Sequence, residues 1–313
     1  MIVDFKSGDN IQNQVLYVVS KKTGISVRGD SYLSVTLRDS SGVIDAKVWD
    51  INDSNSQFEE KDFISINGSV STYRDALQLT INTATVVPKE SINVNDFCPK
   101  CPIELDTMLN DLHSIIDSVT NSSLSALLKR LFDNEKFMSK FTTNSAAKTV
   151  HHAYISGLLE HSITTAKICD SMSALYPKVN RDLVVTAALL HDIGKLKEIS
   201  SFPDNDYTDD GQLLGHIYIG AEMIEFYARQ IENFPRSLLN QLKHCILAHH
   251  GKLEYGSPVT PHIIEAQLLH IADGADANMR RFSDILDEVE PGQWSDRQDF
   301  FLGTKYRHTN IDN

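Results

Sequence analysis

Residues 188–195 read ALLHDIGK, and this stretch decides what kind of domain the larger part of the chain forms. An apolar helical run ends in His191 and Asp192, and a glycine and Lys195 follow. A carboxylate at a helix C-terminus is disfavoured, because the exposed carbonyl groups already make the local potential negative. A bound divalent cation reverses that sign. The stretch therefore indicates part of a metal cradle, with Lys195 one turn on and free to reach a phosphate.

Further imidazoles and carboxylates occur in similar apolar, helical contexts. The chain has 12 histidines, and the first of them is His113. Such groups on inward helical faces are costly unless they are paired or bound to a metal. One buried histidine alone is most often an ordinary core residue, but several together favour a metal site. The residues in such contexts are His161, His191, His216, His249, His250 and Asp273.

Residues 1–88 have the pattern of a β domain. In YLSVTLRD (32–39), Leu33, Val35 and Leu37 alternate with polar residues, which is typical of a half-buried strand. The stretch VIDAKVWD (43–50) resumes the alternation, and two more strands follow around a turn near Arg74. Short strands, close turns and a glycine within a strand together predict an all-β barrel of OB type.

The pattern changes to helical after a linker. Residues 89–104 contain two prolines and little periodicity, so they are predicted to connect two domains. Residues 105–313 then repeat apolar residues at steps of three and four, as amphipathic helices do. We therefore expect a multi-domain chain, in which the OB-type barrel precedes an all-α helical bundle with a C-terminal extension.

Composition limits the function classes. The net charge of −13 argues against a protein that coats nucleic acid through bulk positive charge, so a phosphate-rich ligand must bind at a local site. The first ten residues carry acids and no apolar signal segment, and no stretch approaches a membrane span. Four cysteines do not make a disulfide framework. Cys98 and Cys101 have no second pair to complete a zinc site. We expect a cytoplasmic protein that does not bind membranes.

The order His161, His191-Asp192, Asp273 resembles the HD superfamily of metal-dependent phosphohydrolases, whose helical bundles carry an H…HD…D pattern. The interposed His216 and the pair at 249–250 are similar to the subset that binds two metals. With HHAYISGLLEHS (151–162), HDIGK (191–195) and the preceding barrel, the chain resembles the YhaM-type 3′–5′ exoribonucleases, or cmp-binding factors, over nearly its whole length. Ser156 is a departure, because glycine is expected there.

This resemblance implies a ligand set and an activity. The first metal would be held by His161, His191, Asp192 and Asp273. Asp192 would bridge to a second metal, held by His216 and by one or both of His249 and His250. Mixed imidazole and carboxylate ligation suits Mn²⁺, with Co²⁺, Fe²⁺, Ni²⁺ and Mg²⁺ as alternatives. The implied activity is metal-assisted hydrolysis of single-stranded RNA from the 3′ end, with single-stranded DNA as a further substrate. Water attacks the phosphorus while the cations and Lys195 neutralise the developing charge, which makes Asp192, His191 and Lys195 the catalytic residues.

Two further groups of residues are predicted to bind the substrate. His151 and His152 would join Lys195 at the phosphate or assist proton transfer, although a surface pair at a helix start would look the same. On the barrel, Lys47 and Trp49 lie opposite the apolar face of their strand and would stack and hold a single strand. Arg38, Tyr73 and Arg74 are predicted companions, together with Tyr32. Alternatively, these barrel residues pack against the helical domain or another subunit.

Two other functions stay open from the sequence. One is an HD phosphohydrolase acting on a small nucleotide, with the barrel serving assembly. The other is a non-catalytic DNA-binding replication factor, against which the complete series of metal ligands argues. For each of the three functions we expect a closed homo-oligomer, because most oligomers are symmetric.

Overall fold

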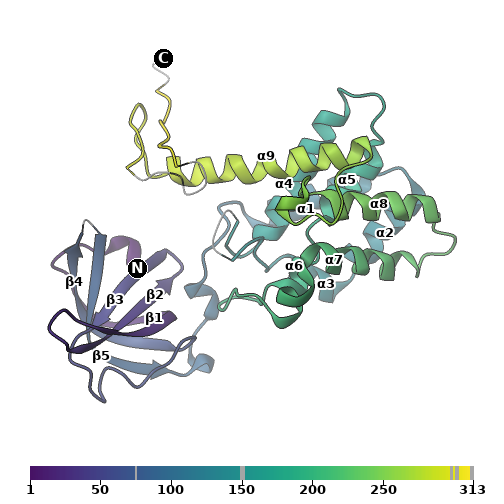
Figure 1. Ribbon diagram of the computed structural model, residues 1–313. Helices are drawn as coiled ribbons and strands as arrows, with labels where there is room; N and C mark the ends of the chain where they lie inside the picture. The colour runs from purple at the N-terminus through teal and green to yellow at the C-terminus, as the bar shows by residue number, and fades with distance from the viewer. Residues whose placement is uncertain (75, 149–151, 297–298, 300–302, 311–313) are drawn as a thin grey trace. The chain divides into compact units, whose positions relative to one another are not determined.

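The structure, a computed structural model, describes residues 1–74, 76–148, 152–296, 299 and 303–310 (Figure 1). The chain divides into two compact units. The first comprises Met1–Lys100 and Ser201–Asn205, and the second comprises Cys101–Ser200 and Asp206–Asn313. In the described part, no helix combines the length and the apolar character that crossing a membrane requires.

The first unit is a closed five-stranded barrel of OB type, as predicted. Its strands are β1 (Asn10–Ile25), β2 (Ser31–Asp39), β3 (Gly42–Val48), β4 (Phe63–Tyr73) and β5 (Ala76–Val87). They close in the order β1-β2-β3-β5-β4, and β3 and β5 pair in parallel while the other pairs are antiparallel. Short 3₁₀ helices cover Ile2–Asp4, Lys89–Ser91 and Val94–Phe97.

The interior of the barrel follows the alternation read from the sequence. On β2 and β3 the apolar residues pair directly across the strands: Leu33 with Val48, Val35 with Ala46, and Leu37 with Ile44. All six side chains are buried. The residues between them therefore point outward, which places Lys47 on the outer surface of the barrel.

The segment Ser201–Asn205, distant in sequence from the barrel, belongs to the first unit. Arg38 donates from Nε to the carbonyl oxygen of Phe97 at 3.2 Å and also hydrogen-bonds the carbonyl oxygen of Pro203. Its guanidinium lies over the rings of Tyr17 and Phe202. The hydroxyl of Tyr17 donates to Oδ1 of Asp204 at 2.9 Å. These contacts give Arg38 a structural role within the unit.

The second unit is the predicted helical bundle. Its helices are α1 (Leu105–Asp117), α2 (Ser122–Phe132), α3 (Glu135–Phe141), α4 (Gly157–Ser173), α5 (Arg181–Leu190), α6 (Lys195–Glu198), α7 (Asp209–Ala228), α8 (Arg236–Ala248) and α9 (Ile264–Leu286), with a 3₁₀ turn at Leu253–Tyr255. Helix α7 contains a kink at Gly215, whose φ of 72° lies outside the helical region.

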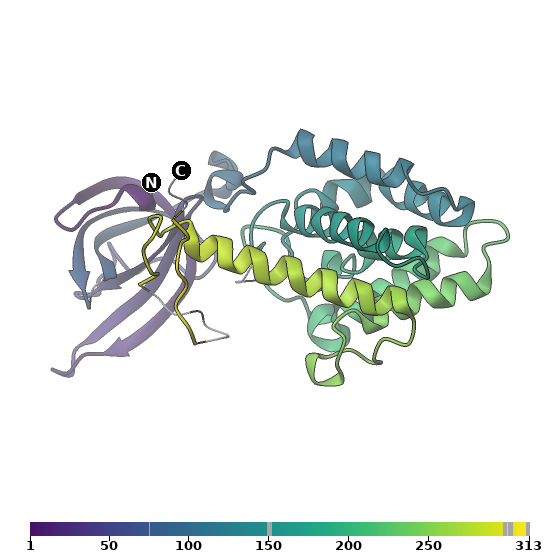
Figure 2. The same cartoon turned by 90° about the horizontal axis from the view of Figure 1, so that it is seen from above.

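Helix α5 is the centre of the bundle, because every residue from Leu183 to Leu190 is buried. It packs against α4, α8 and α9, and the long α9 also contacts α4 and α8 (Figure 2). A helix that is apolar all round must lie in the interior. The His191-Asp192 pair that ends α5 is therefore carried into the middle of the domain.

Candidate metal centre

Five imidazoles and two carboxylates converge from five helices of the second unit. They are His161 on α4, His191 and Asp192 just beyond the end of α5, His216 on α7, His249 and His250 just beyond the end of α8, and Asp273 on α9. The structure thus brings together all seven residues that the resemblance implied as metal ligands. The ends of α5 and α8 thus meet residues within α4, α7 and α9, although these segments are far apart in sequence.

One oxygen of Asp192 faces a first group of donor atoms. Its Oδ2 atom lies 3.5 Å from Nε2 of His161 and 3.3 Å from Nε2 of His191. The same His161 nitrogen is 3.1 Å from that of His191 and 3.2 Å from Oδ1 of Asp273. Donor atoms bound to one cation at about 2.1 Å lie roughly 3 to 4 Å apart. The spacing of these four residues fits that geometry.

The other oxygen of Asp192 faces a second group. Oδ1 lies 3.5 Å from Nε2 of His216 and 3.6 Å from Nε2 of His249. The donor atoms of His216, His249 and His250 lie within 4.8 Å of one another. The carboxylate of Asp192 thus stands between two sets of imidazoles, in the position of a bridging ligand.

The hydrogen bonds of the imidazoles leave one nitrogen of each ring available. Every Nδ1 atom pairs with an acceptor at 2.6–2.9 Å: in chain order these are Asp276 Oδ2, the Ala188 carbonyl, Glu198 Oε1, the Ile246 carbonyl and the Tyr255 carbonyl. A neutral imidazole that donates from Nδ1 carries its lone pair on Nε2. Nitrogen lone pairs that face one another at 3.1 Å repel unless a cation lies between them.

Two polar atoms in this group make no hydrogen bond among the described residues, although both are buried. They are Oδ1 of Asp192 and Nε2 of His216. A buried polar atom without a partner is costly unless it has a function. These atoms, the orientation of the five rings and the donor chemistry all fit a divalent cation.

Three carboxylates behind the imidazoles were not predicted from the sequence. Oδ2 of Asp276 lies 2.6 Å from Nδ1 of His161, and Oε1 of Glu198 lies 2.9 Å from Nδ1 of His216. The third, Glu160, contacts His152 at 3.1 Å. Carboxylates behind metal-binding histidines orient the ring and make it more basic. The signal for Asp276 was its position one helical turn after Asp273.

His152 lies in this outer layer. It is 1% exposed, its Nε2 atom lies 2.8 Å from Oδ2 of Asp276, and its Nδ1 atom lies 3.0 Å from the hydroxyl of Tyr154. Its ring therefore supports Asp276, and the placement gives no support to the predicted contact with substrate phosphate. His151, predicted for the same role, lies outside the described residues.

Lys195 begins α6 and reaches back into the centre. Its Nζ atom lies 2.6 Å from Oδ2 of Asp192, and its side chain is 16% exposed. Burial alone would raise the pKa of the Asp192 carboxyl, but the charge of Lys195 and the contact with His191 outweigh burial and hold that pKa well below 3.8. Asp192 is therefore ionised and ready to bind a cation at neutral pH.

The glycine of HDIGK allows this arrangement. A Cβ atom on Gly194 would overlap the backbone carbonyl of His216 and approach the backbone nitrogen of Gly220 to 2.8 Å. Only a residue without a side chain lets the backbone of α7 come so close to the end of α5. The glycine thus brings His216 to the same place as Asp192.

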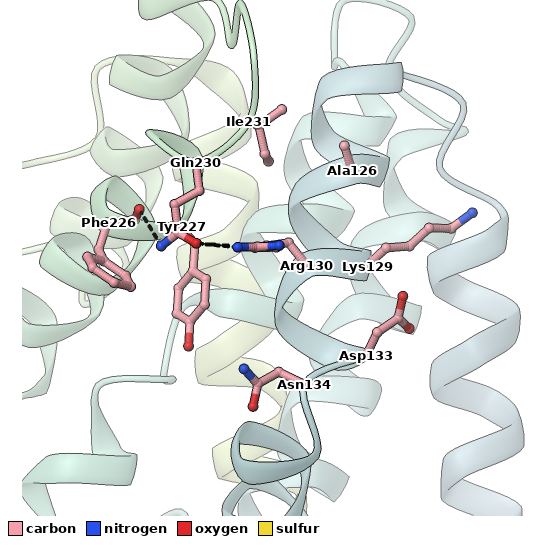
Figure 3. A pocket seen from close by; sticks show the side chains of 9 residues that line it. All are labelled: Ala126, Lys129, Arg130, Asp133, Asn134, Phe226, Tyr227, Gln230 and Ile231. Atoms are coloured by element: carbon pink, nitrogen blue, oxygen red, sulfur yellow. Dashed lines mark hydrogen bonds between the residues drawn. The ribbon is translucent and has the colours of Figure 1, made fainter.

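The cavity in Figure 3 lies elsewhere in the helical unit. Its volume is about 650 Å³, and its lining comes from α2, α7 and their adjoining turns. Arg130 spans it, donating from both Nε and Nη2 to the side-chain oxygen of Gln230. None of the seven converging residues lines this cavity, so we do not assign the reaction to it despite its volume.

On the barrel, Lys47 and Trp49 lie together as expected. Nζ of Lys47 donates to Oγ of Ser34 at 2.8 Å and lies 4.9 Å from the centre of the Tyr32 ring. The rings of Tyr32 and Trp49 are 5.0 Å apart, and Trp49 is 47% exposed. The four residues form one outward-facing cluster.

The other predicted barrel residues, Arg38, Tyr73 and Arg74, do not belong to this cluster. Tyr73 and Arg74 lie at the end of the β4–β5 hairpin, where the guanidinium stands 5.3 Å from the ring centre. The guanidinium of Arg38 is occupied by the contacts described above, so its placement does not support binding of nucleic acid.

Comparison with known proteins agrees with both units. Residues 158–278 match the HD domain family, and residues 17–87 match a family described as an OB-fold nucleic acid binding domain. The 3′-5′ exoribonuclease YhaM of Oceanobacillus iheyensis is 34% identical over 90% of this chain and 89% of its own. That of Bacillus subtilis is 33% identical over 91% and 90%, and that of Listeria welshimeri 32% over 95% and 94%. Because these identities extend over nearly the whole length of this chain and of each relative, the chain belongs to the YhaM family of 3′–5′ exoribonucleases.

Proposed function

We propose that this chain is a divalent-metal-dependent 3′–5′ exoribonuclease that releases mononucleotides from single-stranded RNA. The observation that carries the proposal is the carboxylate of Asp192, whose two oxygens face two separate sets of imidazole Nε2 atoms. The relatives of this chain bear the name 3′-5′ exoribonuclease, and the proposal takes its substrate class and its direction of degradation from that name.

The residues that would hold the cations are those of the two groups. His161, His191, Asp192 and Asp273 would hold one, and Asp192, His216, His249 and His250 the other. When bound, the cations supply Lewis acidity to a water molecule and to the phosphate. The imidazole-rich donor set favours Mn²⁺, Fe²⁺, Co²⁺ or Ni²⁺ over Mg²⁺, which prefers oxygen ligands. We favour Mn²⁺.

The chain's own residues would prepare the site in three ways. Asp276 and Glu198 hold the rings of His161 and His216 in fixed orientations. The nearly complete burial of Asp192 keeps bulk water away from its carboxylate and strengthens its electrostatic contacts. Lys195 places a positive charge 2.6 Å from Asp192, where it would neutralise charge on a phosphate oxygen.

The barrel would bind the single strand ahead of the cleavage site. The cluster of Tyr32, Ser34, Lys47 and Trp49 offers aromatic faces and an ammonium group. Stacking on such rings contributes about 1–3 kcal/mol per base without sequence preference. A neighbouring cavity of about 420 Å³ is lined by Trp49 and by the basic Arg28, together with the acidic Asp30 and Asp50. Single-stranded DNA also carries stacking bases and phosphodiester bonds, so we propose it as a weaker substrate.

We further propose that the protein works in the cytoplasm as a homo-oligomer. All four cysteines are free thiols, which suits a reducing compartment. Large exposed apolar side chains gather on α7, namely Leu213, Leu214, Tyr218 and Phe226, and such patches mark association surfaces. Light scattering of the purified protein should give a multiple of the single-chain mass; a monomer would contradict this part.

The direct test is digestion of end-labelled single-stranded RNA with Mn²⁺. A 3′ label should appear at once as a mononucleotide, while a 5′ label should report progressive shortening. Asp192→Asn should abolish both, and Asp287→Asn, an exposed carboxylate outside the centre, should behave as wild type. If RNA stays intact while free nucleotides are hydrolysed, the enzyme is a small-nucleotide phosphohydrolase and the proposal is wrong.

A further inference from the structure

A cavity of about 690 Å³ adjoins the metal centre and has no assigned occupant. Its lining includes His250 and Asp273, which belong to the converging group, so the cavity opens at the cations' position. One side is formed by α9, through Ile271, Gly274 and Asn278, and another by the turn that carries Tyr255. A ligand in this space would have one end at the metal centre.

The α9 side of this cavity includes a glycine, Gly274. Gly274 lies in the interior of the helix, where glycine is less stable than alanine. Packing does not explain it, because a Cβ atom there would meet no atom within 4 Å among its non-local neighbours. A glycine that the protein's own packing does not require allows a ligand to approach the helix backbone closely.

Tyr255 faces this side with an exposed aromatic ring. Tyr255 is 57% exposed, so packing in the core does not explain why an aromatic residue stands at this position. Its backbone carbonyl accepts the Nδ1 hydrogen bond of His250 at 2.8 Å. The backbone that carries the ring is thereby tied to one of the converging imidazoles. Lys252 lies beside the ring, with Nζ 5.0 Å from its centre, and its ammonium forms an exposed ion pair with Oε1 of Glu254 at 3.3 Å.

Asn278 is held in one orientation at the same cavity. Its Nδ2 atom donates to the carbonyl oxygen of Gly274 at 2.7 Å, and its Oδ1 atom accepts from Arg281 at 2.9 Å. An amide fixed by two bonds still has one N–H and one lone pair for a ligand. Together with Ile271, the lining offers an aromatic face, an apolar surface and a polar amide.

We infer that this cavity is the subsite for the 3′-terminal nucleoside, with Tyr255 stacking on its base and Gly274 allowing the sugar to lie against α9. The inference rests on the proposed exoribonuclease function. The set of an aromatic ring, an amide and a nearby ammonium matches a base, a sugar and a phosphate. Since every base has a π-face, the subsite accepts all four.

The test uses the full-length protein with Mn²⁺ and four single-stranded RNAs that differ only in the 3′-terminal base. Tyr255→Ala should raise KM about 5- to 150-fold, similarly for all four RNAs, because stacking is lost. Tyr255→Phe, which keeps the ring, should stay within about threefold of wild type. Tyr176→Ala removes a similarly exposed tyrosine outside the cavity and is the matched control.

Gly274→Ala separates binding from stability. The alanine should raise Tm by about 2–4 °C, because it favours the helix interior. It should nevertheless raise KM, because the added methyl group occupies the space of the sugar. A purely structural role would not produce opposite changes in stability and binding. If Tm rises and KM stays the same, Gly274 does not contact the substrate and the inference is overturned.

Binding without turnover distinguishes this inference from the proposed function. A calorimetric titration with a nucleoside 5′-monophosphate should show weaker binding to Tyr255→Ala than to wild type, while inorganic phosphate, which has no base, should show a much smaller difference. If wild type fails to degrade RNA, the proposed function fails. If wild type degrades RNA and Tyr255→Ala matches it in KM and in nucleotide binding, only the subsite is refuted.

Discussion

Asp276 shows how one residue can control a site without touching the cation. Its Oδ2 atom lies between Nδ1 of His161 and Nε2 of His152, at 2.6 and 2.8 Å. Glu160 holds the other nitrogen of His152. His161 is therefore the end of a buried chain of three polar residues that fixes its ring.

Replacing Asp276 by asparagine should weaken Mn²⁺ binding about 10- to 100-fold, because the partner of His161 loses its negative charge. Isothermal titration calorimetry of the metal-free protein measures this directly. Asp287→Asn, an exposed carboxylate at the C-cap of the same helix, is the control and should bind Mn²⁺ as wild type does. Unchanged affinity in Asp276→Asn would show that the outer carboxylate does not act on the site.

Ser156 carries a backbone conformation that suits glycine. Its φ of 69° lies in the left-handed region, and its hydroxyl donates to the carbonyl of Thr142 at 2.7 Å. Left-handed conformation costs a non-glycine residue about 1–2 kcal/mol. Glycine was expected here from the family pattern, and the structure gives the physical reason for that expectation.

Comparing Ser156→Gly with Ser156→Ala isolates this cost, because both variants lose the same hydrogen bond. The glycine variant should be more stable than the alanine variant by about 1–2 kcal/mol. Urea unfolding of the two proteins gives the difference. Equal stability would mean that the surrounding loop relaxes and carries no strain.

At the scale of elements, the metal centre depends on how closely helices approach. Gly194 permits contact between the end of α5 and the backbone at His216. Gly194→Ala should destabilise the unit by about 1–3 kcal/mol, as overpacking does, and should also lower Mn²⁺ affinity by displacing His216. Thermal unfolding and calorimetry report the two effects.

Gly42→Ala is a matched control for this substitution, because a Cβ atom there meets only a methyl group at 3.8 Å. It should change neither Tm nor Mn²⁺ affinity appreciably. An unchanged Mn²⁺ affinity in Gly194→Ala would contradict the account of how α7 is positioned.

The elements themselves were predictable where one periodicity dominates. Strands β2 and β3 alternate without interruption, and α5 is a continuous apolar run, so both were recognised. Strand β1 was not singled out, because register shifts between Ile11 and Gln14 and between Val18 and Ser20 break its alternation.

The candidate site was predictable in part. The seven converging residues follow the order of a known family, so their meeting was expected. Glu198 and Glu160 were missed because an acidic residue on a helix gives no sequence signal for lying behind a histidine, and Asp276 had only its position one helical turn after Asp273 to mark it. The contacts of Arg38 with Pro203 and Phe202 were also unpredictable, because they join residues about 165 positions apart whose proximity exists only in the folded chain.

At the scale of the whole molecule, the proposal assigns strand binding to the barrel and chemistry to the helical unit. Trp49→Ala should raise KM for long single-stranded RNA by about 5-fold or more, because one stacking face is lost. A dinucleotide, which offers no further strand for the barrel to bind, should be cleaved with unchanged KM. The experiment is a comparison of KM for the two substrates.

Trp294→Ala is the control for this comparison, since Trp294 is the second of the chain's 2 tryptophans and is 61% exposed in the helical unit. It should leave both KM values unchanged. If Trp49→Ala affects the dinucleotide as much as the long RNA, the barrel residue acts on the fold and does not guide the strand.

The central claim is that Asp192 stands between two cation sites, and Mn²⁺-soaked crystals test it most directly. An anomalous difference map should show two peaks per chain, one among His161, His191, Asp192 and Asp273 and one among Asp192, His216, His249 and His250. In crystals of Asp192→Asn both peaks should weaken or vanish. A map with no peak beside Asp192, or with manganese bound only elsewhere on the chain, would contradict the account.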